Sequence, residues 1–512
     1  MERTILSKVY LIGAGPGDPG LITLKGKELL ARADVVIYDH LAAEDLLRFA
    51  RPGAELVYVG KSGADHTLPQ EQINALVIDK AKSGKTVVRL KGGDPYVFGR
   101  GGEEAEELAA AGIDFEVVPG VSSGAAAPAC AGIPLTHRSC ASSVIFATGH
   151  ENPDKEQSAH NWEAMAKSGS TLVFYMGVKN LPEIVRRLID NGLSEDTPAA
   201  LIQWGTTPKQ RSLLTTLGRA ATDAVEKDFA PPSIFLVGKV ALLRERLNTF
   251  EKRPLFGKGI VVTRSREQAS DTAARLAELG ARVLVFPTIA VAPFPDDGTS
   301  RSMPERLSDY GLIVFTSVNG VRFFFARLAA RGRDARALAG ADIACIGPGT
   351  ASALQSFGLK ADLLPEKFVA ESVAEAVFRH YPQQVLAEQR VLLPRAKQAR
   401  DALPRLLASR CKAVDILELY ETKPGTAHKD SLLEELEAGR IDCVTFASSS
   451  TVKNFLDLIP AEVLRRRPGL KFACIGPITA ATLEEAGLVC HIQPEEHTIP
   501  ALVKALRENL AD

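Results

Sequence analysis

The chain has 512 residues, and its 61 Lys and Arg nearly balance its 62 Asp and Glu, giving a formal net charge of −1. This length exceeds what one hydrophobic core serves, so we expect about two to four domains. The neutral balance argues against a nucleic-acid coat or an electrostatic membrane anchor. No apolar run approaches the roughly 20 residues of a membrane helix, and MERTILSKVYLIG has no signal-peptide pattern, which predicts a cytoplasmic protein.

A glycine-rich loop, LIGAGPGDPG at residues 11–20, follows the first apolar run. Dinucleotide folds have a similar loop, with an acidic residue about 20 residues further on, and Asp39 of VVIYD occupies that place. Pro16 and Pro19, however, remove two backbone donors that a diphosphate would need. The loop therefore predicts a small-molecule site or a plain strand-to-helix turn.

Short β-branched runs such as TVVRL alternate with amphipathic stretches such as GGEEAEELAAAG, which is typical of α/β proteins. The charged segment RERLNTFEKRPLFGKG, at residues 244–259, precedes a new strand and predicts a domain boundary. A Gly/Ala/Pro-rich segment, VVPGVSSGAAAPACAGIPLTHR, divides the first half into two blocks. Its small residues predict either close helix packing or contact with a ligand.

The second half contains an internal repeat. ACIGPGTASALQSFGLKADLLPE returns as ACIGPITAATLEEAGLVCHIQPE, and LIVFTSVNGVRFFF returns as CVTFASSSTVKNFL. KGIVVTRSREQASDTAARLAELGARV returns more faintly as QRVLLPRAKQARDALPRLLASRCKAV. Three matches in one order at nearly one offset predict two duplicated lobes with a cleft between them.

The cysteines and histidines are dispersed. Seven cysteines stand singly, and nine histidines form no H-x-x-x-H pattern. This spacing predicts free thiols in a reducing compartment and no protein-held metal.

Several motifs of the first half together resemble the uroporphyrinogen-III C-methyltransferases of the tetrapyrrole methylase family. They are LIGAGPGDPGLITLKG, VVIYDHL, LKGGDPYVFGRGGEE, VPGVSS, GIPLTHR, FYMG and WGTTPKQR. The resemblance implies a two-domain α/β fold over residues 1–250, with subdomains of about 1–117 and 118–245. It also implies a cleft for S-adenosyl-L-methionine, which leaves as S-adenosyl-L-homocysteine, in place of a dinucleotide.

The resemblance carries cofactor contacts over to specific positions. They are Pro16, Gly92, Gly93, Asp94, Val97, Ser122, Ser123, Met176 and Gly205. Glycines let the backbone approach a cofactor closely, Asp94 offers an acceptor, and Met176 offers a soft apolar wall. Taken singly, a GGD stretch is also a common turn, and a Met at a strand end is also a common core residue.

Asp39 and Lys61 match the proton acceptor and the proton donor proposed for the family. Methylation of a pyrrole carbon that already bears an acetate requires a proton to leave elsewhere on the macrocycle, and a nearby carboxylate can take it. A solvated Asp and a surface Lys are the alternatives. GKSGADH lacks the Arg that usually follows this Lys in the family, which leaves the substrate contacts of its loop open.

A polycarboxylate substrate also requires cations in its cleft. Arg100, Arg138 and Arg211 are candidates because they lie near the motifs. Each is equally well explained as a solvated surface residue.

Residues 257–510 resemble uroporphyrinogen-III synthase through VVTRSREQA, FTSVNGV, CIGPGTA, LYETKP, FASSS and CIGPITA. That family is bilobed, and its first strand–helix–strand unit packs with the C-terminal lobe. The resemblance implies a linker at 251–258 and a synthase domain at 259–512. Lobe 1 would comprise about 259–292 plus 424–512, and lobe 2 about 293–423.

The implied reaction closes linear hydroxymethylbilane with inversion of the last pyrrole and loss of water, so the protein mainly has to hold a folded conformer. Tyr420 matches the family's best catalytic candidate and could assist departure of the hydroxyl, or could simply pack at a strand end. Candidates for binding substrate carboxylates follow predicted strands: Thr316, Ser317, Ser448, Ser449, Gly476 and Thr479. Helix starts bind anions, although the same Ser and Thr residues are also typical helix caps.

The two resemblances predict a bifunctional enzyme that makes uroporphyrinogen III and methylates it twice to precorrin-2, toward siroheme or cobalamin. The expected partners are hydroxymethylbilane, uroporphyrinogen III and a second copy of the chain bound through the first half. We expect no nucleic acid, membrane or metal. One alternative is a methyltransferase for a later corrin precursor with a non-catalytic tetrapyrrole-binding second half; a nicotinamide-dependent oxidoreductase is another, which the loop prolines disfavour.

Overall fold

The computed structural model describes residues 8–40, 44–60, 68–150, 160–264, 266–294, 303–399, 401–425 and 429–511. The chain divides into two compact units. One comprises Met1–Ile260, Ala274–Val283 and Val503–Asp512, and the other comprises Val261–Ala273 and Leu284–Leu502. Within the described ranges, no helix has the length and apolar character needed to cross a membrane.

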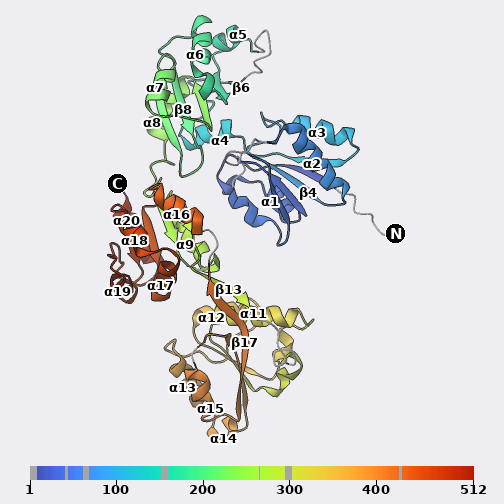
Figure 1. Ribbon diagram of the computed structural model, residues 1–512, viewed down its shortest axis with the longest axis vertical. Coiled ribbons are helices and arrows are strands. Elements are labelled where there is room, and N and C mark those ends of the chain that lie inside the picture. Colours follow the sequence, from blue (N-terminus) through green and yellow to red (C-terminus); the bar gives the residue numbers. More distant parts are fainter. Residues whose placement is uncertain are drawn as a thin grey trace. The chain divides into compact units, whose positions relative to one another are not determined.

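The first sheet is parallel, with the strand order β3-β2-β4-β1-β5. Its strands are β1 (Lys8–Gly13), β2 (Val35–Tyr38), β3 (Glu55–Tyr58), β4 (Val87–Lys91) and β5 (Asp114–Val118), and its helices are α1 (Leu24–Leu30), α2 (Gln70–Lys82) and α3 (Gly101–Ala110). Helices α2 and α3 pack on one face of the sheet and α1 on the other (Figure 1). Burial on both faces explains why the strands are continuous Val, Ile and Leu runs.

The second sheet is mixed, with the order β6-β7-β10-β8-β9. Its strands are β6 (Val144–Thr148), β7 (Thr171–Tyr175), β8 (Pro198–Gln203), β9 (Arg211–Thr216) and β10 (Ser233–Val237). The helices of this part are α4 (Ser123–Cys130), α5 (Trp162–Lys167), α6 (Leu181–Asp190), α7 (Ala220–Glu226) and α8 (Arg244–Leu247). The first sheet thus ends at Val118 and the next helix begins at Ser123, beside the expected subdomain boundary.

Lobe 2 of the C-terminal half is built on a five-stranded sheet with the order β13-β17-β16-β14-β15, in which only β13 is antiparallel to its neighbour. Its strands are β13 (Ile289–Pro293), β14 (Leu312–Phe315), β15 (Asp342–Cys345), β16 (Arg390–Ala396) and β17 (Ala413–Pro424). Its helices are α11 (Val318–Ala329), α12 (Pro348–Gln355), α13 (Ala370–His380), α14 (Gln383–Leu386) and α15 (Ala402–Ala408). Because β13 pairs with β17, the sheet of lobe 2 begins at Ile289 rather than at about residue 293.

Lobe 1 is built on a four-stranded sheet with the order β12-β11-β18-β19. Its strands are β11 (Gly259–Val262), β12 (Arg282–Val285), β18 (Cys443–Phe446) and β19 (Lys471–Cys474). Its helices are α9 (Arg266–Glu278), α16 (Lys429–Glu437), α17 (Ser449–Leu458), α18 (Ala461–Arg465), α19 (Pro477–Glu485) and α20 (Ile499–Leu510).

The two lobes repeat the same local geometry. Ser317 and Ser448 are the N-caps of α11 and α17, with φ of −163° and −168°. Each repeat also has one isolated parallel bridge, Ala344 with Leu363 and Ala473 with Ile492. The expected α/β class and the duplicated lobes are confirmed.

Candidate functional site

Three loops of the N-terminal half meet at the carboxyl edge of the first sheet, where β1, β4 and β5 end. The amide of Gly93 donates to the carbonyl of Gly15 at 2.7 Å, and the amide of Gly15 donates back at 3.2 Å. A Cβ on Gly120 would lie 2.2 Å from the Gly93 carbonyl oxygen, so only glycine allows this close approach. The glycine loop, residues 13–20, and the GGD loop, residues 92–94, are therefore held together by paired backbone hydrogen bonds. We call this joined surface the floor of the site.

Asp94 holds that floor together. Its Oδ1 accepts from the amide of Tyr96 at 2.8 Å, and its Oδ2 accepts from the amide of Gly120 at 3.0 Å. The carboxylate thus stabilises the loop by accepting these two backbone hydrogen bonds. Its contact with a cofactor stays a prediction.

The second subdomain contributes residues next to these loops. The hydroxyls of Ser122 and Tyr175 share a hydrogen bond of 2.6 Å, and the Tyr175 oxygen accepts from the amide of Gly124 at 2.9 Å. The amide of Asp18 donates to Oγ1 of Thr206 at 3.1 Å, which ties the glycine loop to the loop that contains Gly205. Predicted residues from distant parts of the chain are therefore brought together.

Unusual backbone conformations gather around the same loops. Phe98, Arg100, Met176, Trp204 and Thr206 all have positive φ, between 50° and 71°. Such residues cost free energy and cluster at ligand sites. Met176, directly after β7, is also exposed, as are the neighbouring motif residues Tyr96 and Phe98.

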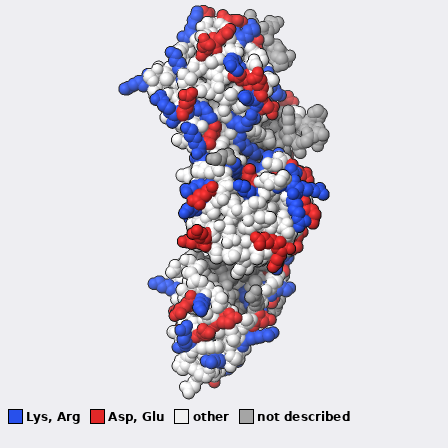
Figure 2. Space-filling model, turned by 90° about the vertical axis from the view of Figure 1, so that its left-hand side faces the viewer, with Lys and Arg blue, Asp and Glu red and all other residues white. Residues whose placement is uncertain are grey.

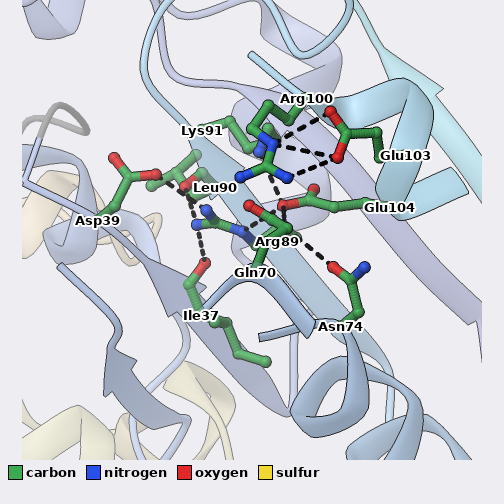
Figure 3. Close-up of polar contacts among 10 residues, drawn as sticks. All are labelled: Ile37, Asp39, Gln70, Asn74, Arg89, Leu90, Lys91, Arg100, Glu103 and Glu104. Carbon is green, nitrogen blue, oxygen red and sulfur yellow. Dashed lines mark hydrogen bonds and ion pairs between the residues drawn. The ribbon is translucent and has the colours of Figure 1, made fainter. Parts of the chain in front are cut away.

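Asp39 belongs to a chain of charges that runs into the sheet (Figure 3). Nη2 of Arg89, on β4, donates to Oδ2 of Asp39 at 2.9 Å, and its Nε donates to Oε1 of Glu104 at 3.3 Å. Nζ of Lys91 donates to the same Glu104 oxygen at 2.8 Å, and the side-chain amide of Gln70 does so at 3.0 Å. Glu104 thus holds two buried cations, one of which holds Asp39.

This chain is buried, apart from the end that Asp39 forms. The side chains of Arg89, Lys91 and Glu104 are 4–5% exposed, whereas that of Asp39 is 27% exposed. Burial lowers the pKa of Lys91, and the adjacent Arg89 cation adds to that effect. Asp39 is therefore the most exposed charged member of this cluster, and its role as proton acceptor stays a prediction.

The predicted residues of the C-terminal half lie where strands lead into helices. Oγ of Ser317 accepts from the amide of Gly320 at 2.9 Å and shares a 2.8 Å hydrogen bond with the Tyr420 hydroxyl. Burial raises the pKa of Tyr420, although the Ser317 contact opposes the effect, so the phenol stays protonated near neutrality. Thr316, Ser317 and Tyr420 therefore form one group within lobe 2.

In lobe 1 the corresponding residues cap helices. Ser448 accepts from the amide of Thr451 at 3.3 Å in a capping box, and the hydroxyl of Ser449 donates to the carbonyl of Ile478 at 3.1 Å. Gly476 is the N-cap of α19, and Thr479 is buried in its first turn. The helix-cap interpretation of Ser448 is confirmed, and carboxylate binding by this group stays a prediction.

Two family models match the chain in consecutive segments. The model of tetrapyrrole (corrin/porphyrin) methylases matches residues 8–221, and that of uroporphyrinogen-III synthase HemD matches residues 270–504. The porphyrin biosynthesis protein HemD of Ruminiclostridium josui is 39% identical over 503 residues, which is 98% of this chain and 97% of the relative. This chain belongs to the HemD family of porphyrin biosynthesis proteins.

Other relatives match mainly the methylase domain. A uroporphyrinogen-III C-methyltransferase of Bacillus subtilis is 43% identical, covering 64% of this chain and 68% of the relative. A uroporphyrin-III C-methyltransferase structure from Thermus thermophilus, complexed with S-adenyl homocysteine, is 40% identical and covers 46% of this chain and all of that one, with a TM-score of 0.40.

The predicted cations of the methylase domain differ in their surroundings. Arg100 makes an exposed ion pair with Glu103 at 2.7 Å, and Arg138 is exposed. Arg211 donates to the carbonyl of Lys227 at 2.6 Å and lies over the Phe229 ring, which gives it a structural task. Substrate binding by all three stays a prediction, and Lys61 lies outside the described residues.

Several residues of the methylase site were missed in the sequence. Arg89 sits in the apolar run TVVRL, where a charged residue predicts a buried partner, and Glu104 sits in GGEE, where it looks like a helix-surface residue. Tyr175 precedes Met176 in FYMG and looks like an ordinary strand residue. In the described residues no group of three or more His, Cys, Asp or Glu is placed to hold a metal ion.

Proposed function

We propose that the chain is a bifunctional enzyme that cyclises hydroxymethylbilane to uroporphyrinogen III and methylates it twice, with S-adenosylmethionine, to precorrin-2. The observation that carries this proposal is the presence of both domains in one chain, with a HemD relative aligned along 98% of it. Because the product of the synthase domain is the substrate of the methylase domain, the fusion joins consecutive steps.

The methylase site suits this cofactor. Its floor offers backbone groups, Ser122 and Ser123 supply hydroxyls at the start of α4, and Met176 supplies a soft apolar side chain. Figure 2 shows Lys and Arg interspersed with Asp and Glu on the face drawn, in keeping with the net charge of −1. S-adenosylmethionine, when bound, supplies an electrophilic methyl group.

Asp39 acts as the proton acceptor in this proposal. After a pyrrole carbon has gained a methyl group, a proton leaves another position of the macrocycle, and the Asp39 carboxylate can take it. Arg89 holds that carboxylate at 2.9 Å and thereby fixes its orientation. Exposed apolar side chains such as Tyr96 and Phe98 offer contacts for the macrocycle.

Tyr420 acts in the synthase domain. Its protonated hydroxyl can donate to the hydroxyl of the substrate as that group departs as water. The carbon–oxygen bond breaks, and the freed carbon bonds to the substituted α-carbon of the terminal ring in the conformer that the lobes hold. The bond from that α-carbon to the neighbouring bridge carbon then breaks and re-forms at the ring's other α-carbon, which inverts the ring. The proton released there replaces the one that Tyr420 donated. Ser317 orients Tyr420 through their shared hydrogen bond.

Anaerobic incubation with fresh hydroxymethylbilane tests both activities. Without S-adenosylmethionine we expect type III uroporphyrin after oxidation, and with it a dimethylated product by mass analysis. Type I uroporphyrin alone would contradict the synthase assignment. Supplied uroporphyrinogen III that stays unmethylated would contradict the methylase assignment.

Two further expectations belong to the proposal. The seven cysteines are free, which supports a reducing compartment such as the cytoplasm. A homodimer through the methylase domain is expected from the family resemblance. Light scattering at two protein concentrations tests the dimer.

A further inference from the structure

A cavity of about 160 Å³ lies within lobe 2 of the synthase domain. Thr316 lines it directly after β14, Ile346 directly after β15, and Arg395 near the end of β16. The remaining walls are apolar, with Leu393 and Leu403 among them. The cavity therefore lies at the carboxyl ends of parallel strands and presents one charged side chain.

The strand order shows that the cavity lies where ligands bind in open α/β sheets. From β14 the chain places β15 on one side and then β16 on the other, so the order reverses between β14 and β16. Ligands of open α/β sheets bind at such reversals, outside the carboxyl ends of the strands. Thr316 and Arg395 flank this crevice.

Arg395 stands out by its burial. It is 8% exposed, and the other buried polar residues described in residues 261–502 are all threonines. Its Nη2 donates to Oδ1 of Asp401 at 2.8 Å. The Asp401 side chain is 59% exposed, so the partner of this buried guanidinium is largely in solvent. The guanidinium has further N–H donors in a planar fork that suits a carboxylate.

The internal repeat places a second arginine at the same point of lobe 1. KGIVVTR aligns with QRVLLPR, so Arg264 after β11 corresponds to Arg395 on β16. The chain order of that sheet also reverses beside β11, between β11 and β18. Burial lowers the pKa of Arg264, as expected for a guanidinium in poorly hydrated surroundings.

We propose that the lobe 2 cavity binds one carboxylate side chain of the linear tetrapyrrole through Arg395, and that Arg264 binds another in lobe 1. This inference rests on the proposed synthase function and adds the residues that recognise the substrate's acid groups. The cavity is large enough for a carboxymethyl or carboxyethyl group and too small for a pyrrole chain.

Steady-state kinetics of the full chain with hydroxymethylbilane test the proposal. For Arg395→Met we expect the KM for type III formation to rise about 10- to 100-fold, the range for a charge-assisted hydrogen bond, with kcat changed less than about threefold. Arg395→Lys should restore part of the affinity, since it keeps the charge and loses the fork. Arg264→Met should raise KM in the same way.

Arg405→Met is the matched control, because it removes one charge from an exposed position on α15 of the same lobe. Its KM should equal that of the parent. Methylation of supplied uroporphyrinogen III by each preparation checks that the rest of the chain is intact, and circular dichroism on heating checks the synthase fold.

Ala370→Leu provides a second route that keeps the charge. Ala370 lines the cavity at the start of α13, so a larger side chain should fill the space and raise KM. Unchanged KM in both Arg395→Met and Ala370→Leu would overturn the proposal. If the parent chain itself yields only the type I isomer, the proposed synthase function is wrong. That result is seen in the parent without any variant, so it is distinct from a failure of the arginine proposal.

Discussion

The two halves of the chain bury different kinds of polar group. The methylase half buries Arg89, Lys91 and Glu104 in one connected cluster. In the part of the synthase half that the structure describes, the buried polar residues are threonines and Arg395. This difference agrees with the proposed chemistry. The methylase half would use a carboxylate, Asp39, held by a buried ion-pair cluster, whereas the synthase half would mainly hold one conformer of its substrate.

The largest effect should come from removing the carboxylate at the open end of the methylase cluster. Asp39→Asn should lower methylation of supplied uroporphyrinogen III by about 10²–10⁴-fold, because the proposed proton acceptor is lost. Formation of type III uroporphyrinogen by the same protein is the internal control and should be unchanged. Methylation within threefold of the parent would show that Asp39 is not the acceptor.

Loss of the buried carboxylate of Glu104 should destabilise the methylase half selectively. Glu104→Gln leaves Arg89 and Lys91 without their shared carboxylate, so we expect the free energy of unfolding to fall by about 3–5 kcal/mol. The chain's two tryptophans, Trp162 and Trp204, are both in this half, so tryptophan fluorescence in urea follows it alone. Glu103→Gln, at an exposed ion pair one residue away, is the control and should cost less than about 1 kcal/mol.

A smaller change is expected at the synthase tyrosine. Tyr420→Phe removes the proposed donor to the departing hydroxyl and should lower kcat for type III formation about 10- to 100-fold, while methylation is unchanged. Tyr310→Phe, also within lobe 2, is the control. Full synthase turnover in Tyr420→Phe would assign Tyr420 a packing role against Phe323, on which it stacks at 5.3 Å.

The smallest effect is a pH dependence of synthase stability. Desolvation raises the pKa of Asp415, but the hydrogen bonds from Arg390 and Tyr310 together lower it by more, so the net shift is downward. A depressed carboxyl pKa stabilises the fold above the ordinary value near 3.8, and this contribution is lost as the pH falls through the folded value. The difference in thermal midpoint between the parent and Asp415→Asn should therefore shrink below pH 4; an equal difference at pH 3 and pH 7 would contradict this assignment.

The sequence predicted the loops of the methylase site because their residues are consecutive in GAGPGDPG and GGDPYVFGRGGEE. It did not predict the partner of Asp39, since Arg89 lies 50 residues away and meets it only through the adjacency of β2 and β4. The position of Arg211 near WGTTP predicts a substrate-binding cation. In the folded chain, however, its guanidinium donates to the carbonyl of Lys227, which the sequence alone does not place beside it. Sequence proximity finds a loop, whereas strand order decides which side chains share a face.

The start of lobe 2 shows the same limit. In the sequence, AVAPFP at residues 290–295 resembles a proline-bearing connector between the lobes. Pairing with β17 instead makes Ile289–Pro293 a strand. The repeat was more informative, because its alignment predicts equivalent positions for Ser317 and Ser448, and both are N-caps in the structure.

The duplicated lobes have a consequence for register. The substrate is itself a string of like rings with like acid groups, so the two proposed arginine sites would also accept it displaced by one ring. Within the described residues, the edge strand β13 has no counterpart in the four-stranded sheet of lobe 1, and Tyr420 lies on β17 of lobe 2. If Tyr420 acts on the hydroxymethyl group as proposed, this asymmetry fixes the direction in which a near-symmetric protein holds the chain.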